Sequence, residues 1–364
     1  MSTKTLTDLI SLAQEPSSAR RRELLRQVTD VFFEGGAARP ATEMALFDDV
    51  LTHLAGEMEA AVRAELAERM ADAAQAPPGL TRKLARDSIA VAGSVLRRSN
   101  ALTDCDLVQV AKAFGQDHLR AISQRPTVSV VVTDVIVERA DDTTLNVLLR
   151  NEKAELSRAS HETAVDRATV NPDLHEAVVR RRALPADLLN EMYFVVESRL
   201  RNEILERNAE LDPAALELAL AAGRKRLATR DGAFPPDYAE SEAAVRAMMA
   251  QQAITAATLT SFLRKGERTR FLIALSELGD VDFHTARRIL ENRQLDALAI
   301  VCKGADFDRQ LFLTFAVLIL DREVNAMGRA REYGQIYADL PRETAQRTLR
   351  FWKMRRQTGD MAAA

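Results

Sequence analysis

Five short segments of the chain repeat one pattern at a nearly constant spacing. In each segment an apolar residue precedes Thr, Ser or Pro and opens a stretch of helix-forming residues. The pairs are Leu80-Thr81, Leu102-Thr103, Val128-Ser129, Leu156-Ser157 and Leu184-Pro185, with successive apolar residues 22, 26, 28 and 28 positions apart. Periods of about 20 to 50 residues are typical of arrays in which each repeat is one supersecondary unit. This repeat constrains the fold more than any other feature of the chain.

The repeated pairs have the chemistry of a helix start. A Ser or Thr at the N-cap accepts a hydrogen bond from a free backbone N–H of the first turn. Thr103, with Asp106 three residues later, forms a variant of the capping box, and Pro185 suits the first helical turn, so its register can shift by one residue. We therefore expect a helix to begin at each of the five pairs.

The segment VSVVVTDVIV, from Val128 to Val137, has the residue types of a buried β-strand. Its apolar residues nevertheless fall at helical spacing, and Asp134 interrupts strict alternation. A single strand among helices would also leave its backbone groups without partners. We interpret this run as a helix.

The composition agrees with an all-α fold. Ala, Leu, Arg and Glu dominate the 364 residues, whereas 5% are aromatic and 14 are glycine. A second short helix fits between successive starts, in segments such as SIAVAGSVLRRSN and TTLNVLLRNE. Since two-helix units with one apolar side stack into a continuous core, the sequence predicts a HEAT-like α-solenoid.

The strongest break in this pattern is DGAFPPDYAES at residues 231–241, where Gly and Pro gather. We expect an N-terminal repeat domain at residues 1–230 and a C-terminal helical domain at residues 241–364. A weaker repeat in the second part aligns FLIALSELGDVDF with LDALAIVCKGADF at an offset of 24 residues.

The segments AVRAELAERMA, VIVERADDTTLNVLLRNEKAELS and RRALPADLL, taken in succession, resemble a bacterial family, domain of unknown function 2336. The resemblance covers residues 5–320, and AVRAELAERMA and LLRNEKAELS are its most specific parts. Residues after Asp321 are expected to vary within the family. The resemblance implies a cytoplasmic α-solenoid of HEAT-type repeats with no assigned enzymatic activity.

Charge and cysteine usage exclude several classes of protein. The net charge of −3 gives no overall attraction to nucleic acid or to an anionic membrane. Cys105 and Cys302 have no metal-ligand spacing and are expected to be small buried residues of a reducing compartment. The longest apolar run, Leu311–Leu320, is about half of a membrane crossing, and the N-terminus lacks the order of a signal peptide. We expect a soluble, cytoplasmic protein.

No nucleotide-binding or hydrolase motif appears, and the five histidines form no metal-binding pattern. We therefore expect no metal, no cofactor and no enzymatic activity. One histidine, His118 in QDHLRAISQR, loosely resembles a phospho-accepting residue with a basic neighbour. The favoured alternative is a partly buried histidine that is hydrogen-bonded to the adjacent repeat.

Arginines recur where one helix of each repeat ends. If the repeats stack, these side chains form a ridge, and the candidate partner-binding residues are Arg98, Arg125, Arg150, Asn151 and Arg181. The ridge could also grip the phosphates of a nucleic acid. The favoured alternative is structural, because arginines in a last turn complement the helix dipole and bond its free carbonyls.

Two further segments carry apolar stripes. A long helix expected at Ala186–Glu210 has a stripe that belongs either to the core or to a homo-oligomer interface. The tail is a basic amphipathic helix that either docks on an acidic partner or a membrane surface, or caps the end of the array. Its candidate docking residues are Arg350, Trp352, Lys353, Arg355 and Arg356.

These observations favour a non-catalytic scaffold or adaptor that binds a protein partner through the surface of the array, in bacterial signalling. Nucleic-acid binding through the arginine ridge and histidine phosphotransfer through His118 are the alternatives.

Overall fold

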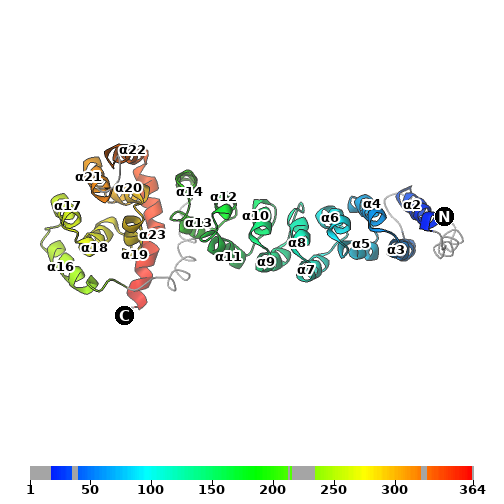
Figure 1. Cartoon of the computed structure of the whole chain (residues 1–364). Helices are drawn as coiled ribbons and strands as arrows, with labels where there is room; N and C mark the ends of the chain where they lie inside the picture. Colours follow the sequence, from blue (N-terminus) through cyan, green and yellow to red (C-terminus); the bar gives the residue numbers. More distant parts are fainter. Residues whose placement is uncertain (1–17, 35–39, 212–213, 215–233, 321–325, 363–364) are drawn as a thin grey trace. The chain divides into compact units, whose positions relative to one another are not determined.

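The computed structural model describes residues 18–34, 40–211, 214, 234–320 and 326–362, with backbone alone for 18–21, 326 and 353–362. These residues form helices joined by short connections and contain no β-strand, which confirms the all-α class (Figure 1). Two compact units are present, Met1–Ala183 and Leu184–Ala364. Among the described helices, none has both the length and the apolar character needed to cross a membrane.

The first unit is a succession of short helices. They are α2 (Ser18–Glu34), α3 (Ala41–Gly56), α4 (Ala60–Ala71), α5 (Pro78–Ala85), α6 (Ile89–Arg98), α7 (Asp104–Ala113), α8 (Gln116–Ser123), α9 (Val130–Arg139), α10 (Asp142–Arg150), α11 (Arg158–Ala168), the 3-10 turn η1 (Pro172–Leu174) and α12 (His175–Arg180). Helices two places apart pack together: α4, α6, α8, α10 and α12 form one row. In the other row α3 packs on α5, and α7, α9 and α11 pack in series, whereas α5 and α7 are not closely packed (Figure 1).

The second unit has a core of its own. Its helices are α13 (Ala186–Met192), α14 (Ser198–Glu210), α16 (Tyr238–Ala250), α17 (Ala256–Lys265), α18 (Arg268–Gly279), α19 (Phe283–Glu291), α20 (Leu295–Gly304), α21 (Arg309–Ile319), α22 (Ala326–Asp339) and α23 (Arg342–Ala362). Helix α23 packs on α13, α14 and α20. These contacts assign α13 and α14 to the second unit, and the division between the two units falls at residues 183–184. Part of the Gly/Pro segment 231–241 lies outside the described residues, and the domain boundary expected there stays a prediction.

The valine run is helical, as its periodicity predicts. Helix α9 begins at Val130, directly after Ser129, and buries Val132 and Ile136. One residue before the helix has a strand-like contact: Val128 forms an isolated parallel β-bridge with Ala154, which lies in the connection between α10 and α11. Helical packing therefore determines the structure of the run, and its first residue joins two connections.

The predicted helix starts agree with the structure at four of the five pairs. Thr103 caps α7 in a full capping box with Asp106, and Ser157 caps α11 by accepting a hydrogen bond from the Ser160 N–H, 3.0 Å. Ser129 and Pro185 occupy the N-cap positions of α9 and α13 without a side-chain hydrogen bond.

The prediction at Thr81 is wrong, because α5 already begins at Pro78. Pro is favoured at a first helical position, where no backbone N–H is needed. The next two N–H groups, of Gly79 and Leu80, donate to the carboxylate of Asp48 on α3 at 2.6 Å each. The cap of α5 thus comes from the neighbouring helix, which no local sequence pattern reveals.

Two predictions in the second unit also change. The helix expected at Ala186–Glu210 is interrupted, since α13 ends at Met192 and α14 starts at Ser198. Its apolar stripe is buried in the unit, at Leu189, Met192, Tyr193, Val196 and Leu200. The stripe is therefore core, and the turn after Met192 directs Tyr193 and Phe194 into that core.

The weaker repeat has a structural offset of 26 residues, not 24. Asp282 and Asp308 are the N-caps of α19 and α21 and accept hydrogen bonds from the N–H groups of Thr285 and Leu311, at 2.9 and 2.7 Å. The sequence alignment had paired Asp282 with Asp306, which instead has a left-handed backbone with φ of 62°.

Candidate functional site

Arg125, predicted on the binding ridge, is buried at the end of α8. Its guanidinium donates hydrogen bonds to the carbonyl oxygens of Leu96 and Ser99, at 2.7 and 2.8 Å. These carbonyls belong to the C-terminal end of α6, where the last turn has no intrahelical donors. Burial lowers the pKa of this guanidinium, while the charge of Asp104 acts in the opposite direction. Arg125 thus closes the end of α6.

Arg181 does the same two helix pairs later. It follows α12, is 1% exposed, and donates to the carbonyl oxygens of Leu149 and Asn151 at 3.0 and 3.1 Å, and to that of Ala154. Burial is again the main influence on its guanidinium and lowers the pKa. The C-terminal end of α10 is therefore held by the residue that follows α12.

Asn151 completes the series between these two arginines. It follows α10, and its side-chain amide donates to the carbonyl oxygens of Ser123 and Arg125, at 2.9 and 2.8 Å. The residues after α8, α10 and α12 thus reach back in turn to the ends of α6, α8 and α10. Arg125, Asn151 and Arg181 thus join successive pairs of helices. Arg125 and Arg181 are buried and Asn151 is half-buried, and their predicted role in binding a partner stays a prediction.

The second row of helices contains the same interaction, an arginine that donates to carbonyl oxygens at the end of the preceding helix in that row, and it was not predicted from the sequence. Arg139 at the end of α9 donates to the carbonyl oxygen of Phe114 beyond α7, at 3.2 Å. Arg167 near the end of α11 donates to the carbonyl oxygen of Ala140 beyond α9, at 2.8 Å, and pairs with Asp142. The available signal was the basic residue in the last turn of each of these helices.

Two ridge residues remain near the surface, and both face acidic side chains. Arg98 pairs with Asp72, 2.9 Å between nitrogen and oxygen, and with Glu68. Arg150 is exposed and lies 3.6 Å from a carboxylate oxygen of Glu176. These pairs neutralise the positive charge that a nucleic-acid surface would require.

His118 is buried on α8 and held in place from two sides. Its Nε2 lies 2.8 Å from the carbonyl oxygen of Asp87, which belongs to the preceding repeat. Its ring stacks on Phe114 with 4.5 Å between centroids. This arrangement matches a histidine that joins adjacent repeats, and it leaves little ring surface for phosphotransfer.

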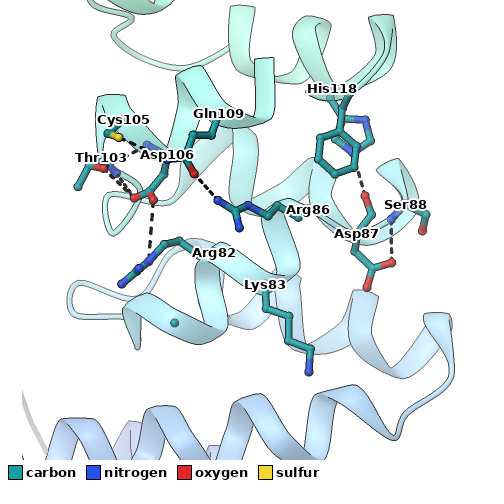
Figure 2. A pocket seen from close by; sticks show the side chains of 12 residues that line it. Arg82, Lys83, Arg86, Asp87, Ser88, Thr103, Cys105, Asp106, Gln109 and His118 are labelled. Atoms are coloured by element: carbon teal, nitrogen blue, oxygen red, sulfur yellow. Dashed lines mark hydrogen bonds and ion pairs between the residues drawn. The ribbon is translucent and has the colours of Figure 1, made fainter. Parts of the chain in front are cut away.

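An open groove of about 1120 Å³ lies between α5 and α7, with the start of α8 at one end. It opens where these two helices are not closely packed. Figure 2 shows Arg82 of α5, and Arg86 directly after α5, pointing toward the α7 side of the groove. Arg86 donates to the side-chain oxygen of Gln109, and the Nε of Arg82 donates to the Pro78 carbonyl oxygen at 3.1 Å.

The carboxylates of this groove are used within the protein. Asp87 accepts two hydrogen bonds from Arg63, at 2.5 and 3.0 Å, and these bonds are the main cause of its lowered pKa. Asp106 accepts from the backbone N–H and the hydroxyl of Thr103, at 3.0 and 2.7 Å, and lies 3.9 Å from the Nε of Arg82. The groove therefore presents spare cationic donors.

One cysteine lines this groove. Cys105 is exposed near the start of α7, which corrects the expectation that both cysteines are buried. Cys302 is fully buried, and burial raises the pKa of its thiol. Within the described ranges, no three His, Cys, Asp or Glu side chains gather as metal ligands would.

Residues 91–350 match a family model described as an uncharacterised protein conserved in bacteria, DUF2336. The chain belongs to this family. Neither the curated proteins nor the solved structures contain a match to it. The DUF2336 match begins later than the resemblance suggested, so AVRAELAERMA lies before it. It also runs 30 residues past Leu320, so the family region extends further at this end than the resemblance indicated.

The C-terminal helix α23, within which the DUF2336 match ends, packs on the other helices of the second unit. Trp352 is 3% exposed and lies against Tyr193 and Phe194, at 5.2 and 4.9 Å between ring centroids. Its indole is in the core, which favours the capping alternative for this helix over the docking alternative, whereas Arg350 is exposed. The side chains of the remaining candidates, Lys353, Arg355 and Arg356, lie outside the described residues.

Proposed function

We propose that this protein is a non-catalytic adaptor whose first unit is a HEAT-like α-solenoid that binds an acidic segment of a partner protein. The binding surface is the groove between α5 and α7. The solenoid assignment is supported by the two rows of helices and by the side chains that reach from one repeat to the end of the previous one. Such arrays commonly present extended binding surfaces.

The unused donors of Arg82 and Arg86 carry this proposal. Both side chains are exposed, 49% for Arg82, and each donates one hydrogen bond within the described structure. The remaining N–H groups of two guanidiniums one helical turn apart suit carboxylates, which arginine binds in a forked geometry. The groove carboxylates compete little for them, since Asp87 is held by Arg63, and Asp106, which is bonded to Thr103, lies 3.9 Å from the Nε of Arg82.

A protein partner fits these observations better than nucleic acid. The net charge is −3, and the cations that would have formed a phosphate-binding stripe, Arg125 and Arg181, are buried. Binding to a phosphate backbone needs several clustered cations and is steeply dependent on salt. Two adjacent guanidiniums in a bounded groove are more suited to a few carboxylates of a peptide.

The test uses a fluorescein-labelled peptide with four glutamates in a glycine-serine background, followed by anisotropy. We expect binding that weakens at least about tenfold in the Arg82→Glu/Arg86→Glu variant, because attraction becomes repulsion at both positions. Lys153→Glu, an exposed lysine of the same unit outside the groove, is the matched control and should change little. A duplex DNA of similar charge should bind more weakly than the peptide.

The position of the peptide is read from Cys105, the exposed member of the two cysteines. Bound peptide should slow alkylation of Cys105, while the buried Cys302 stays unreactive with and without peptide. Tighter binding of DNA than of peptide, or equal binding by the double variant, would count against the proposed function.

A further inference from the structure

A second, smaller groove adjoins the first on the other side of α5. It has a volume of about 410 Å³ and lies between the last turns of α3 and the first turns of α5. Gly79 and Lys83 line both grooves, so the two grooves adjoin at α5, and we call them together the channel. A segment bound in the first groove therefore ends next to the second.

The second groove has the opposite charge. Asp49 on α3 and Glu57, directly after the end of α3, line this groove and are exposed. Within the described structure neither carboxylate takes part in a hydrogen bond or an ion pair. The neighbouring Asp48 differs, because its oxygens accept the N–H groups of Gly79 and Leu80. The spare charge of this groove is therefore negative.

The lysine between the grooves only partly offsets this charge. The ammonium of Lys83 donates to the carbonyl oxygen of Thr52 on α3, at 2.8 Å, and keeps its positive charge, but Asp48, Asp49 and Glu57 bring three negative charges to the same groove. Figure 2 shows its side chain directed away from Arg86. The channel thus carries spare negative charge over α3 and spare positive charge over α5, and these helices pack directly on each other.

The spacing of packed helices sets the spacing of charges in a ligand. Neighbouring helices pack with axes about 8–10 Å apart, and an extended chain advances about 3.3 Å per residue. The step between the axes of α3 and α5 therefore corresponds to about three residues of an extended segment.

We propose that this channel binds an extended, dipolar segment of the partner protein. Its acidic residues lie over Arg82 and Arg86, and basic residues about three positions away lie over Asp49 and Glu57. This inference rests on the proposed function and names the chemistry of the partner. The separation of the two charges is defined, while their order along the segment is free, because an extended chain can enter in either direction. A polyanion, including an anionic membrane or a nucleic acid, would meet repulsion at α3.

The experiment compares three labelled peptides by anisotropy on the full chain. The dipolar peptide has a glutamate pair and a lysine pair separated by one neutral residue, which places their centres about three positions apart. The second peptide has serines in place of the lysines, and the third has ten neutral residues between the pairs. We expect the dipolar peptide to bind about fivefold more tightly than the other two.

The variant Asp49→Lys/Glu57→Lys should remove this preference and leave the binding of the acid-only peptide equal or stronger. The matched control is Glu138→Lys/Glu155→Lys, two exposed glutamates of the same unit that line neither groove, and it should keep the preference. Thermal unfolding of each variant verifies that the unit remains folded.

Equal affinity of the dipolar and acid-only peptides would overturn this inference and leave the proposed function standing. A preference that survives in the Asp49→Lys/Glu57→Lys variant would overturn it as well. If the acid-only peptide fails to bind and Arg82→Glu/Arg86→Glu changes nothing, both the inference and the proposed function are overturned.

Discussion

At the residue scale, the most distinctive side chains of the first unit are two buried arginines, Arg125 and Arg181. A buried guanidinium is stable only where its N–H groups meet acceptors, and here the acceptors are the carbonyl oxygens at the open end of a helix. Arg181 serves Leu149, Asn151 and Ala154 in this way. The same helix end carries the negative pole of the helix dipole. The Arg181 side chain thus donates to free backbone carbonyls, places a positive charge at the negative end of the helix dipole, and fills buried space between two helix pairs.

Replacing this side chain by an apolar one of similar length should be costly. Arg181→Met leaves three buried carbonyl groups without their donor, and we expect the free energy of unfolding of the first unit to fall by about 3 kcal/mol. The adjacent Arg180→Met is the control, because Arg180 makes an exposed pair with Glu176 of the kind that contributes less than about 1 kcal/mol. Urea unfolding followed by far-UV circular dichroism measures both, and equal losses would contradict the structural role of Arg181.

A histidine beside this arginine makes the junction sensitive to acid. The His161 Nδ1 lies 3.1 Å from the Ser157 carbonyl oxygen, and its Nε2 lies 3.4 Å from the Nε of Arg181. A neutral ring with its hydrogen on Nδ1 satisfies both contacts. Burial, and then the charge of Arg181, lower the pKa of His161 from 6.5 to about 4.

Because the unfolded chain takes up this proton near pH 6.5 and the folded chain only near pH 4, stability falls as the pH drops through this window. We expect a loss of up to about 3 kcal/mol from this residue. His161→Gln should remove that part of the pH dependence, measured as the free energy of urea unfolding at pH 7, 5.5 and 4.5. His53→Gln, at an exposed histidine, should retain the full slope, and an unchanged slope in His161→Gln would rule out this origin.

At the scale of elements, the sequence predicted more about where helices lie than about which face they bury. The capping box of Thr103 and the periodicity of the valine run are local, so both could be recognised directly. Arg125 and Arg150 look alike in sequence, yet one is buried and the other exposed. The difference depends on the neighbouring repeat, and the cap that Asp48 provides to α5 has the same non-local origin.

Helix α23 shows the same ambiguity. A basic amphipathic segment with one tryptophan reads equally as a docking helix or as a packing helix, and only its contacts with α13, α14 and α20 decide. The groove could not be predicted from the sequence either. Arg82 and Arg86 belong to no motif, and they form a candidate site only because α5 and α7 leave a groove between them.

Trp352→Ala should therefore destabilise the second unit by about 3–5 kcal/mol, the usual cost of removing a large buried aromatic side chain. Thermal unfolding followed by circular dichroism measures the loss, with the exposed Arg350→Ala as the control that changes stability little. Unchanged stability combined with lost binding to anionic vesicles would instead revive the docking role of Trp352.

At the scale of the whole molecule, the chain comprises two units that each bury a core. The single tryptophan lies in the second unit, so its fluorescence reports that unit, whereas circular dichroism reports helices of both. Two-state behaviour is an approximation for single small domains and fails readily in longer arrays.

We accordingly expect the two signals to give different midpoints in urea. Arg181→Met should lower the circular dichroism midpoint of the first unit and leave the Trp352 fluorescence midpoint within error. Coincident shifts of both signals in this variant would show that the chain unfolds as one cooperative block.

Arg125, Asn151 and Arg181 each bond to the end of a helix that precedes them in the chain, so the first unit can be completed only in the order of its synthesis. During synthesis the chain leaves the ribosome from its N-terminus, so the carbonyls that end α6 wait for Arg125, and those that end α10 wait for Arg181. Each repeat is completed by the one translated after it, and a nascent chain halted after Arg150 would carry an unfinished last repeat whatever the quality of the earlier ones.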